Sequence, residues 1–200
     1  MKSRGFTLVE LMIALCIISI ITAIALPNFI RARMAANESA TIAICKKFGT
    51  SEEIYRRTDW DGNGIKEYAQ NIGPNGGNGN LESLYLNVAN GNALVGLSDE
   101  GMVMAEIPNT GNISGTNPRN GYLLMVQLSA TFPTIVSYVN TKGAMINGYG
   151  ICAIPAQYSL SGISTFQMDS SGVVYKKDQG ASTLVPAYNT NPTNLWGQTE

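Results

Sequence analysis

Glu10 is the only charged residue in the otherwise largely apolar run over residues 6–30. About 20 apolar residues are enough for a helix to cross a bilayer, so this run is long enough to do so. A carboxylate costs roughly 2.5–3.5 kcal/mol near the centre of a bilayer and less near its edge. Because Glu10 lies near the start of the run, its cost is moderate, and a compensating partner is expected. Glu10 is therefore a candidate functional residue that pairs with a positive charge.

A second candidate site lies over residues 59–67, which read Asp-Trp-Asp-Gly-Asn-Gly-Ile-Lys-Glu. Oxygen-bearing side chains at alternate positions, followed by glycine and an aliphatic residue, resemble the first half of an EF-hand calcium loop. The last ligand position of such a loop falls on Gln70, which cannot act as a bidentate carboxylate. Asp, Asn and Gly are also turn residues, so a plain turn is the alternative. The calcium ligands that the resemblance implies are the side chains of Asp59, Asp61, Asn63 and Glu67 and the carbonyl of Ile65.

The three cysteines are spaced without any recognisable motif. Cys16 lies in the apolar run and is expected to be a small packing residue. Cys45 and Cys152 are candidates for a disulfide in an oxidising compartment, with two unpaired thiols as the open alternative.

Motif content argues against an enzyme. The chain has no histidine, which excludes His-based triads and His-ligated metal sites. It also lacks a Cys-x-x-Cys pair, a phosphate-binding glycine loop and a nucleophile elbow. The neighbouring carboxylates Glu52 and Glu53 fall on a predicted helix face and are expected to be solvated. The net charge of −1 and the lack of a dominant basic patch give no indication of a nucleic-acid ligand.

One long helix is expected to carry the first of these residues. The apolar run over residues 6–30 predicts a transmembrane and assembly helix, and Pro27 is compatible with it at the expense of a kink or a lost hydrogen bond. Beyond it, residues 31–57 are predicted to continue the helix into a head, because a stripe recurs at three- and four-residue steps. The stripe consists of Ile30, Met34, Asn37, Thr41, Ile44, Phe48 and Tyr55.

The remainder of the chain suits one modest globular head over residues 58–180. A loop and two short helices are expected over residues 73–79, 81–86 and 98–107. Strands are predicted over residues 121–128, 148–153, 163–168 and 173–177, the last two forming a hairpin. The fold class is therefore α+β, with a long amino-terminal helix packed on a small antiparallel sheet. Residues 181–200, which are polar and contain two prolines, are expected to be a loosely held tail.

The segment Gly5-Phe6-Thr7-Leu8-Val9-Glu10-Leu11 resembles the class III signal of type IV pilins and type II secretion pseudopilins. Pro27 also falls where many such pilins have a helix-loosening proline. The resemblance implies that a prepilin peptidase cuts between Gly5 and Phe6, removes the leader over residues 1–5, and that the new amino group of Phe6 is methylated. It also implies that Glu10 becomes a contact between subunits.

Electrostatics supports this role for Glu10. Cleavage would leave the amino group of Phe6 one helical turn from Glu10, so the terminus of an incoming chain can meet the Glu10 carboxylate of a neighbour. Such a pair is far stronger in a dry helical bundle than in water, and removing one partner strands the other. The pair would specify axial register while apolar side chains supply the bulk of the packing.

The expected function is that of a structural subunit of a type IV pilus or a type II secretion pseudopilus filament. The resemblance implies three partners: other copies of this chain or related pilins, the prepilin peptidase and methyltransferase, and an inner-membrane assembly platform. No cofactor is required, and calcium is an optional ligand. The chain is expected in the bacterial inner membrane with a cytoplasmic amino terminus, and later in a periplasmic or extracellular filament. This orientation rests on the resemblance, because two basic residues lie on each side of the span.

Three alternatives are open. A cleaved secretory signal would use Ala23-Ile24-Ala25 as its cleavage site, but Glu10 places an acid where the apolar core of the signal should begin. A plain transmembrane anchor leaves Gly5, Phe6 and Glu10 unexplained. A membrane-tethered calcium-dependent binding module that never polymerises is the alternative from a different functional class.

Overall fold

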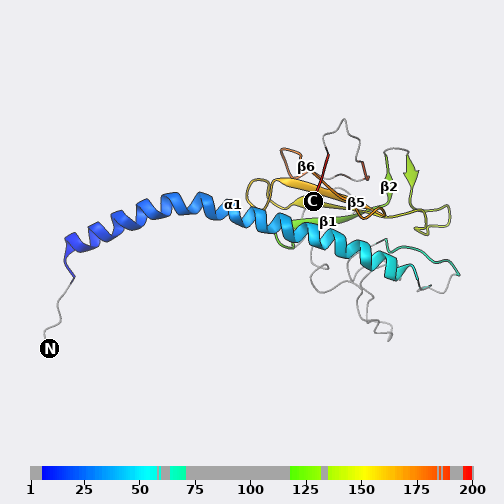
Figure 1. Ribbon diagram of the computed structural model, residues 1–200, viewed down its shortest axis with the longest axis horizontal. Helices are drawn as coiled ribbons and strands as arrows, with labels where there is room; N and C mark the ends of the chain where they lie inside the picture. The colour runs from blue at the N-terminus through cyan, green and yellow to red at the C-terminus, as the bar shows by residue number, and fades with distance from the viewer. Residues whose placement is uncertain are drawn as a thin grey trace, which may run out of the picture.

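The computed structural model describes residues 6–57, 59, 64–70, 118–131, 135–183, 185, 187–189 and 196–199. Within these ranges one helix, α1 (Leu8–Tyr55), precedes seven strands. The strands are β1 (Tyr122–Gln127), β2 (Ser129–Ala130), β3 (Val136–Ser137), β4 (Gly150–Pro155), β5 (Ser164–Asp169), β6 (Val174–Asp178) and β7 (Gly197–Gln198). Figure 1 shows α1 as a long rod whose second half lies along the sheet and whose first half projects away from it.

Helix α1 contains 48 residues, which corresponds to a length of about 70 Å. Thr7 is its N-cap, and the helix passes through Pro27 without ending. All of its buried residues lie in the second half, at Thr41, Cys45, Phe48, Gly49, Ser51, Glu52 and Tyr55. The predicted stripe is confirmed at Thr41, Phe48 and Tyr55, whereas Cys45 is buried more deeply than the predicted Ile44.

The main sheet has the strand order β1-β4-β5-β6-β7, and every neighbouring pair is antiparallel. Strands β2 and β3 form a separate two-stranded sheet. The turn between β5 and β6 closes with a hydrogen bond of 3.0 Å from Gly172 N to Asp169 O. Gly172 has a φ of 76°, which favours glycine at that place.

The sheet has two faces with different coverings. The face that we call the helix face packs Leu124, Ile151 and Phe166 against Cys45 and Phe48 of α1. The opposite face, which we call the outer face, carries a smaller cluster of Leu123, Met125, Cys152 and Ile154, with Ala156 and Val185 packed against it. Successive residues of a strand point to opposite faces, so each of β1 and β4 contributes to both clusters.

The predicted α+β fold of one long apolar helix and a small antiparallel sheet is confirmed. The four predicted strands correspond to β1, β4, β5 and β6, with boundaries shifted by one or two residues. The predicted loop over residues 73–79 and the predicted helices over residues 81–86 and 98–107 lie outside the described residues.

The carboxyl-terminal segment differs from the expected loosely held tail wherever the structure describes it. Strand β7 pairs with β6, with Gln198 opposite Tyr175. Tyr188 is buried, and its backbone bonds to Ser129 and Thr131 at 2.9 and 2.8 Å. On the outer face, Gln127 and Gln167 bind this segment through the carbonyls of Val185 and Asn189 at 2.7 and 3.1 Å. These contacts join residues far apart in the sequence, so the polar composition of the tail gave no sign of them.

Candidate functional site

Glu10 lies in the first turn of α1 and closes a capping box with Thr7. Glu10 Oε2 accepts hydrogen bonds from the backbone N–H and the hydroxyl of Thr7, at 2.9 and 2.7 Å. In return, Thr7 Oγ1 accepts a hydrogen bond of 3.3 Å from Glu10 N. This reciprocal arrangement satisfies donors at the helix start that would otherwise lack partners. Only Oε2 of Glu10 is engaged by the described residues, so Oε1 is left to accept a bond from an external donor.

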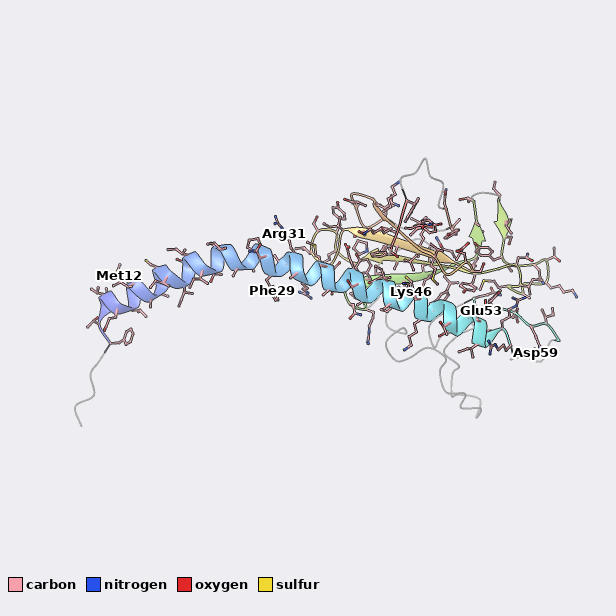
Figure 2. The ribbon with its side chains drawn as sticks, viewed as in Figure 1. Met12, Phe29, Arg31, Lys46, Glu53 and Asp59 are labelled. Carbon is pink, nitrogen blue, oxygen red and sulfur yellow. The ribbon has the colours of Figure 1, made fainter. Side chains whose placement is uncertain are left out.

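The surface around Glu10 is almost wholly apolar and exposed. Phe6, Leu8 and Ile24 are 77%, 73% and 65% exposed, and large side chains continue in the same way to Phe29. Among the described residues, α1 is the one helix that is long and apolar enough to cross a membrane. Figure 2 shows Met12 and Phe29 on the half of α1 that projects beyond the sheet.

The hydroxyl groups of the same half are satisfied within the helix. Ser19 donates to the carbonyl of Cys16, and Thr22 donates to the carbonyl of Ile18, both at 2.8 Å. The flank of the helix therefore presents hydrocarbon to its surroundings, with Glu10 as its only charge. Such a surface can be covered either by lipid or by the same helix of other copies. The Glu10 carboxylate favours the covering that offers it a positively charged partner.

Glu38 joins α1 to the head just beyond the apolar half. Its Oε1 accepts bonds from the backbone N–H groups of Ile163 and Ser164, both at 3.0 Å, and its Oε2 accepts from Ser164 Oγ at 3.3 Å. Beside it, Asn37 Nδ2 donates to Ser161 O at 2.8 Å, and the Tyr122 hydroxyl donates to Ser164 O at 2.9 Å. Burial and the nearby Glu38 carboxylate raise the pKa of Tyr122, so this hydroxyl stays a donor. Glu38 was not predicted from the sequence as a residue of this site, although Asn37 of the predicted stripe pointed to this part of the helix.

Glu52 is buried, which corrects the expectation that Glu52 and Glu53 are both solvated. Glu52 is 0% exposed, whereas Glu53 is exposed. The spacing of Cys45, Phe48, Glu52 and Tyr55 places Glu52 on the packed side of α1. Its Oε2 accepts a bond of 2.9 Å from Ala69 N, and its Oε1 has no hydrogen-bond partner among the described residues. Burial is the main cause that raises the pKa of Glu52 well above its ordinary value, with a smaller contribution from Glu53.

The end of α1 fixes the segment over residues 64–70 through several contacts, one of which is a hydrogen bond of 3.3 Å from the Tyr68 hydroxyl to Glu53 Oε1. Besides the bond from Ala69 to Glu52, the Arg56 guanidinium donates to the Tyr68 hydroxyl at 2.7 Å and lies over the Tyr68 ring at 4.9 Å. Tyr68 in turn packs edge-on against Tyr149 with 5.0 Å between ring centroids. The chain that leaves the helix is therefore held against the head.

The structure describes three of the five predicted calcium ligands. Asp59 Oδ2 accepts a bond of 2.8 Å from Gly64 N, Ile65 is half-buried, and Glu67 is buried. Asp61 and Asn63 lie outside the described residues. The Gln70 amide donates to the carbonyl of Gly143 instead of turning back to the loop. Figure 2 places Asp59 beyond the end of α1, at the opposite end of the helix from Met12, so this loop and Glu10 are separate sites.

The predicted disulfide is absent, because Cys45 and Cys152 are free and lie on opposite faces of the sheet. Cys45 packs in the cluster of the helix face, and Cys152 packs in the cluster of the outer face. Burial raises the pKa of both thiols to about 12, which makes them unreactive as nucleophiles. Both cysteines therefore act as small packing residues.

Residues 22–198 match the family described as "Protein of unknown function (DUF2950)", and residues 1–26 match the prokaryotic N-terminal methylation motif. No solved structure matches the chain.

Two relatives of the chain are pilin proteins. The chain is 41% identical over 54 residues to the "Type IV major pilin protein PilA" of Myxococcus xanthus, which covers 27% of this chain and 24% of the relative. It is 37% identical over 55 residues to the "Type IV wide pilus major component PilA4" of Thermus thermophilus, which covers 28% of this chain and 42% of the relative. The matched region thus spans less than half the length of either relative.

Three findings indicate the same protein family. They are the apolar helix with its capped Glu10, the methylation motif and the pilin relatives. The chain belongs to the DUF2950 family over most of its length, and its amino-terminal motif makes it a type IV pilin family protein.

Proposed function

We propose that this chain is a structural subunit of a type IV pilus, which polymerises through α1 after a prepilin peptidase cuts between Gly5 and Phe6. The observation that carries the proposal is Glu10, a capped carboxylate at the start of an exposed apolar helix. Its partner would be the methylated amino group of Phe6 on an adjoining copy. Two relatives named as pilus components support a pilus over a secretion pseudopilus.

Exposure of the first half of α1 supports this assembly mode. Burying a large aliphatic or aromatic side chain stabilises a protein by roughly 1.5–3 kcal/mol. Within one copy none of this gain is realised for the exposed residues before Phe29. In the inner membrane, with the amino terminus cytoplasmic, lipid would cover this surface, and in a filament the same helices of other copies would replace the lipid. The gain in hydrocarbon contact is similar in both environments, so charge pairing at Glu10 decides in favour of the filament.

In this proposal the head forms the outer surface of the filament and has a structural, non-catalytic role. The absence of histidine from the sequence and the unreactive state of Cys45 and Cys152 both agree with a structural role. The assembly platform of the inner membrane and the peptidase are the further partners that this role requires.

The first prediction concerns maturation. Mass spectrometry of the chain from filaments sheared off cells should find Phe6 as the first residue, carrying one added methyl group on its amine. The same preparation should contain the chain as a stoichiometric component. A chain that keeps Met1, or one that begins after a signal-type cleavage near Ala25, would contradict the pilus proposal. A tethered calcium-binding module would instead stay in the membrane fraction.

A further inference from the structure

A cavity of about 360 Å³ lies where the apolar half of α1 meets the head. Arg33 contributes the only charge among its described lining residues, and Gln157 and Ser161 contribute the polar groups. Leu123 and Ala156 form part of an apolar wall. The volume is at the lower end of the range for small-molecule sites, roughly 300–1,000 Å³.

The described residues leave Arg33 without a neutralising partner. No ion pair or hydrogen bond joins its guanidinium to them, and the carboxylate of Glu38, five residues further along α1, is engaged by Ile163 and Ser164. Ser161 Oγ already exchanges bonds with Gln157, at 3.0 and 2.9 Å. The donors that remain for a ligand are the Arg33 guanidinium and the side-chain amide of Gln157. A guanidinium is always charged and offers a planar fork that matches phosphate oxygens.

The position of Arg33 along α1 places this cavity at the surface of the membrane. Arg33 follows Ile30, the last residue of the apolar run, by three positions, which is a rise of about 4.5 Å. The headgroup layer of a bilayer is about 5–7 Å thick on each side. If residues 6–30 span the bilayer, the guanidinium therefore lies at the height of the lipid phosphates. Figure 2 shows Arg31 at this junction of the free and docked halves of the helix.

We propose that this cavity binds the phosphate of a phospholipid headgroup, with Arg33 and Gln157 as donors and the apolar wall against the glycerol carbons. The inference rests on the membrane insertion in the proposed function and extends it to a specific lipid contact. Binding would fix the height of the head above the bilayer before assembly. Withdrawal of the subunit into a filament would have to release the lipid.

Arg31 supplies a matched control for this proposal. Two residues are separated by 200° around an ideal helix, so Arg31 and Arg33 lie on nearly opposite sides of α1. Arg31 does not line the cavity. A general attraction of basic residues to an anionic surface would treat the two arginines alike, whereas the proposed site distinguishes them.

The experiment counts phosphatidylglycerol molecules retained by the full chain in neutral-detergent micelles, using native mass spectrometry over a range of lipid concentrations. Arg33→Gln should weaken retention by about ten-fold or more, the loss expected for a hydrogen bond between charged groups, whereas Arg31→Gln should weaken it by no more than about five-fold, the general attraction of one basic residue to a membrane surface. Ala156→Leu, which narrows the cavity and keeps the charge, should also weaken retention. Near-ultraviolet circular dichroism checks that each variant keeps a folded head.

Three outcomes would overturn the inference. Equal losses for Arg33→Gln and Arg31→Gln would reduce the effect to general electrostatics, and no loss for either would remove the site. The third outcome is binding of inorganic phosphate that depends on Arg33 and that added lipid does not reduce, as measured by titration calorimetry. The ligand of the cavity would then be a free anion and not a lipid. Flotation of the full chain with vesicles tests insertion separately, so a failure of the proposed function is distinguishable from a failure of the lipid site.

Discussion

Two carboxylates on α1 have opposite environments and opposite consequences. Glu10 is exposed, and its bonds to Thr7 are made within the first turn of the helix. Glu52 is fully buried and has one backbone donor, Ala69 N, for its two oxygens. Burying a carboxylate without adequate donors favours its neutral form. Glu52 is therefore suited to an uncharged role inside the head, whereas Glu10, with Oε1 not engaged by the described residues, is suited to pairing with an external cation.

The burial of Glu52 predicts a pH-dependent stability. Because burial raises its folded-state pKa above the ordinary value of 4.5, the folded head retains the proton at pH values where the unfolded chain has lost it. This stabilisation is full below about pH 4.5 and is lost as the pH rises toward the folded-state pKa. Glu52→Gln mimics the neutral carboxyl and should make the head more stable at neutral pH, with a smaller fall in melting temperature above pH 4.5.

The measurement is the melting temperature of the full chain in neutral detergent, followed by near-ultraviolet circular dichroism between pH 4 and 8. Glu53→Gln is the matched control, because Glu53 is the exposed neighbour of Glu52. This variant should keep most of the pH dependence of the wild-type melting temperature. If Glu52→Gln and wild type lose stability in parallel over this range, Glu52 does not titrate as the structure indicates.

The capping box makes it possible to separate the charge of Glu10 from its local structural role. Glutamine at the same position of a capping box can also form a hydrogen bond with the N-cap residue. Glu10→Gln therefore removes the charge and keeps the capped helix start, whereas Glu10→Val removes both the charge and the cap. Both variants should insert into the membrane more readily, because the desolvation cost of the carboxylate is gone. Both should nonetheless fail to assemble, because the Phe6 amine of the neighbour loses its partner.

Immunoblots of sheared filaments and of the membrane fraction measure the two steps separately. We expect at least a ten-fold loss of filament for each variant, which corresponds to about 1.4 kcal/mol. Normal filament from Glu10→Gln together with none from Glu10→Val would show that the helix cap matters and that the charge pair does not.

Local sequence patterns predicted the helix and the strands, but they could not predict contacts between residues that are far apart in the chain. The alternation around Ser171 predicted β5 and β6, because the apolar side chains Phe166, Met168 and Val174 all lie on the helix face and turn residues separate the two strands. The site residue Glu10 was equally visible, since a single acid stands out in an apolar run. The polar bonds of Gln127 and Gln167 to the carboxyl-terminal segment were not visible, because they depend on strands brought together by the fold. Glu38 was missed for the same reason, since its donors lie more than 120 residues away in the chain.

The loop after α1 is predicted to bind calcium weakly. With the weak affinity expected for a loop that lacks its last acidic ligand, on the order of 10⁻⁴–10⁻³ M, calcium at a ten-fold excess should stabilise the head by about 1.4 kcal/mol. That gain corresponds to a rise of about 3–5 °C in melting temperature for a chain of this size. Asp61→Ala should abolish the rise, and magnesium, which prefers a smaller octahedral site, should not replace calcium. Equal melting temperatures in calcium and in chelator would identify the loop as a turn closed by Asp59 and Gly64.

In the molecule as a whole, α1 has an exposed apolar half and a second half that packs on the head. Large side chains up to Phe29 are exposed, whereas the buried residues of the helix begin at Thr41. Figure 1 shows the first half of α1 projecting from the head with no described element beside it. The free half therefore adds apolar surface to the molecule and no packing to the head. The head, in turn, holds the helix through Glu38, Cys45, Phe48 and Tyr55.

This division predicts that a fragment over residues 31–200 folds by itself. Its melting temperature should differ from that of the full chain in neutral detergent by less than about 3 °C, the shift expected for about 1 kcal/mol. The fragment should also stay monomeric without detergent, because the exposed side chains of the free half are absent from it.

Glu38→Ala in the same fragment should lower the free energy of unfolding by about 2 kcal/mol, since backbone donors of Ile163 and Ser164 lose a charged acceptor. Thr50→Ala is the control on the same helix, because Thr50 is exposed and its hydroxyl bonds only within the helix. An unfolded fragment would mean that the apolar half stabilises the head, and an unchanged Glu38→Ala variant would remove Glu38 from the joint between helix and head.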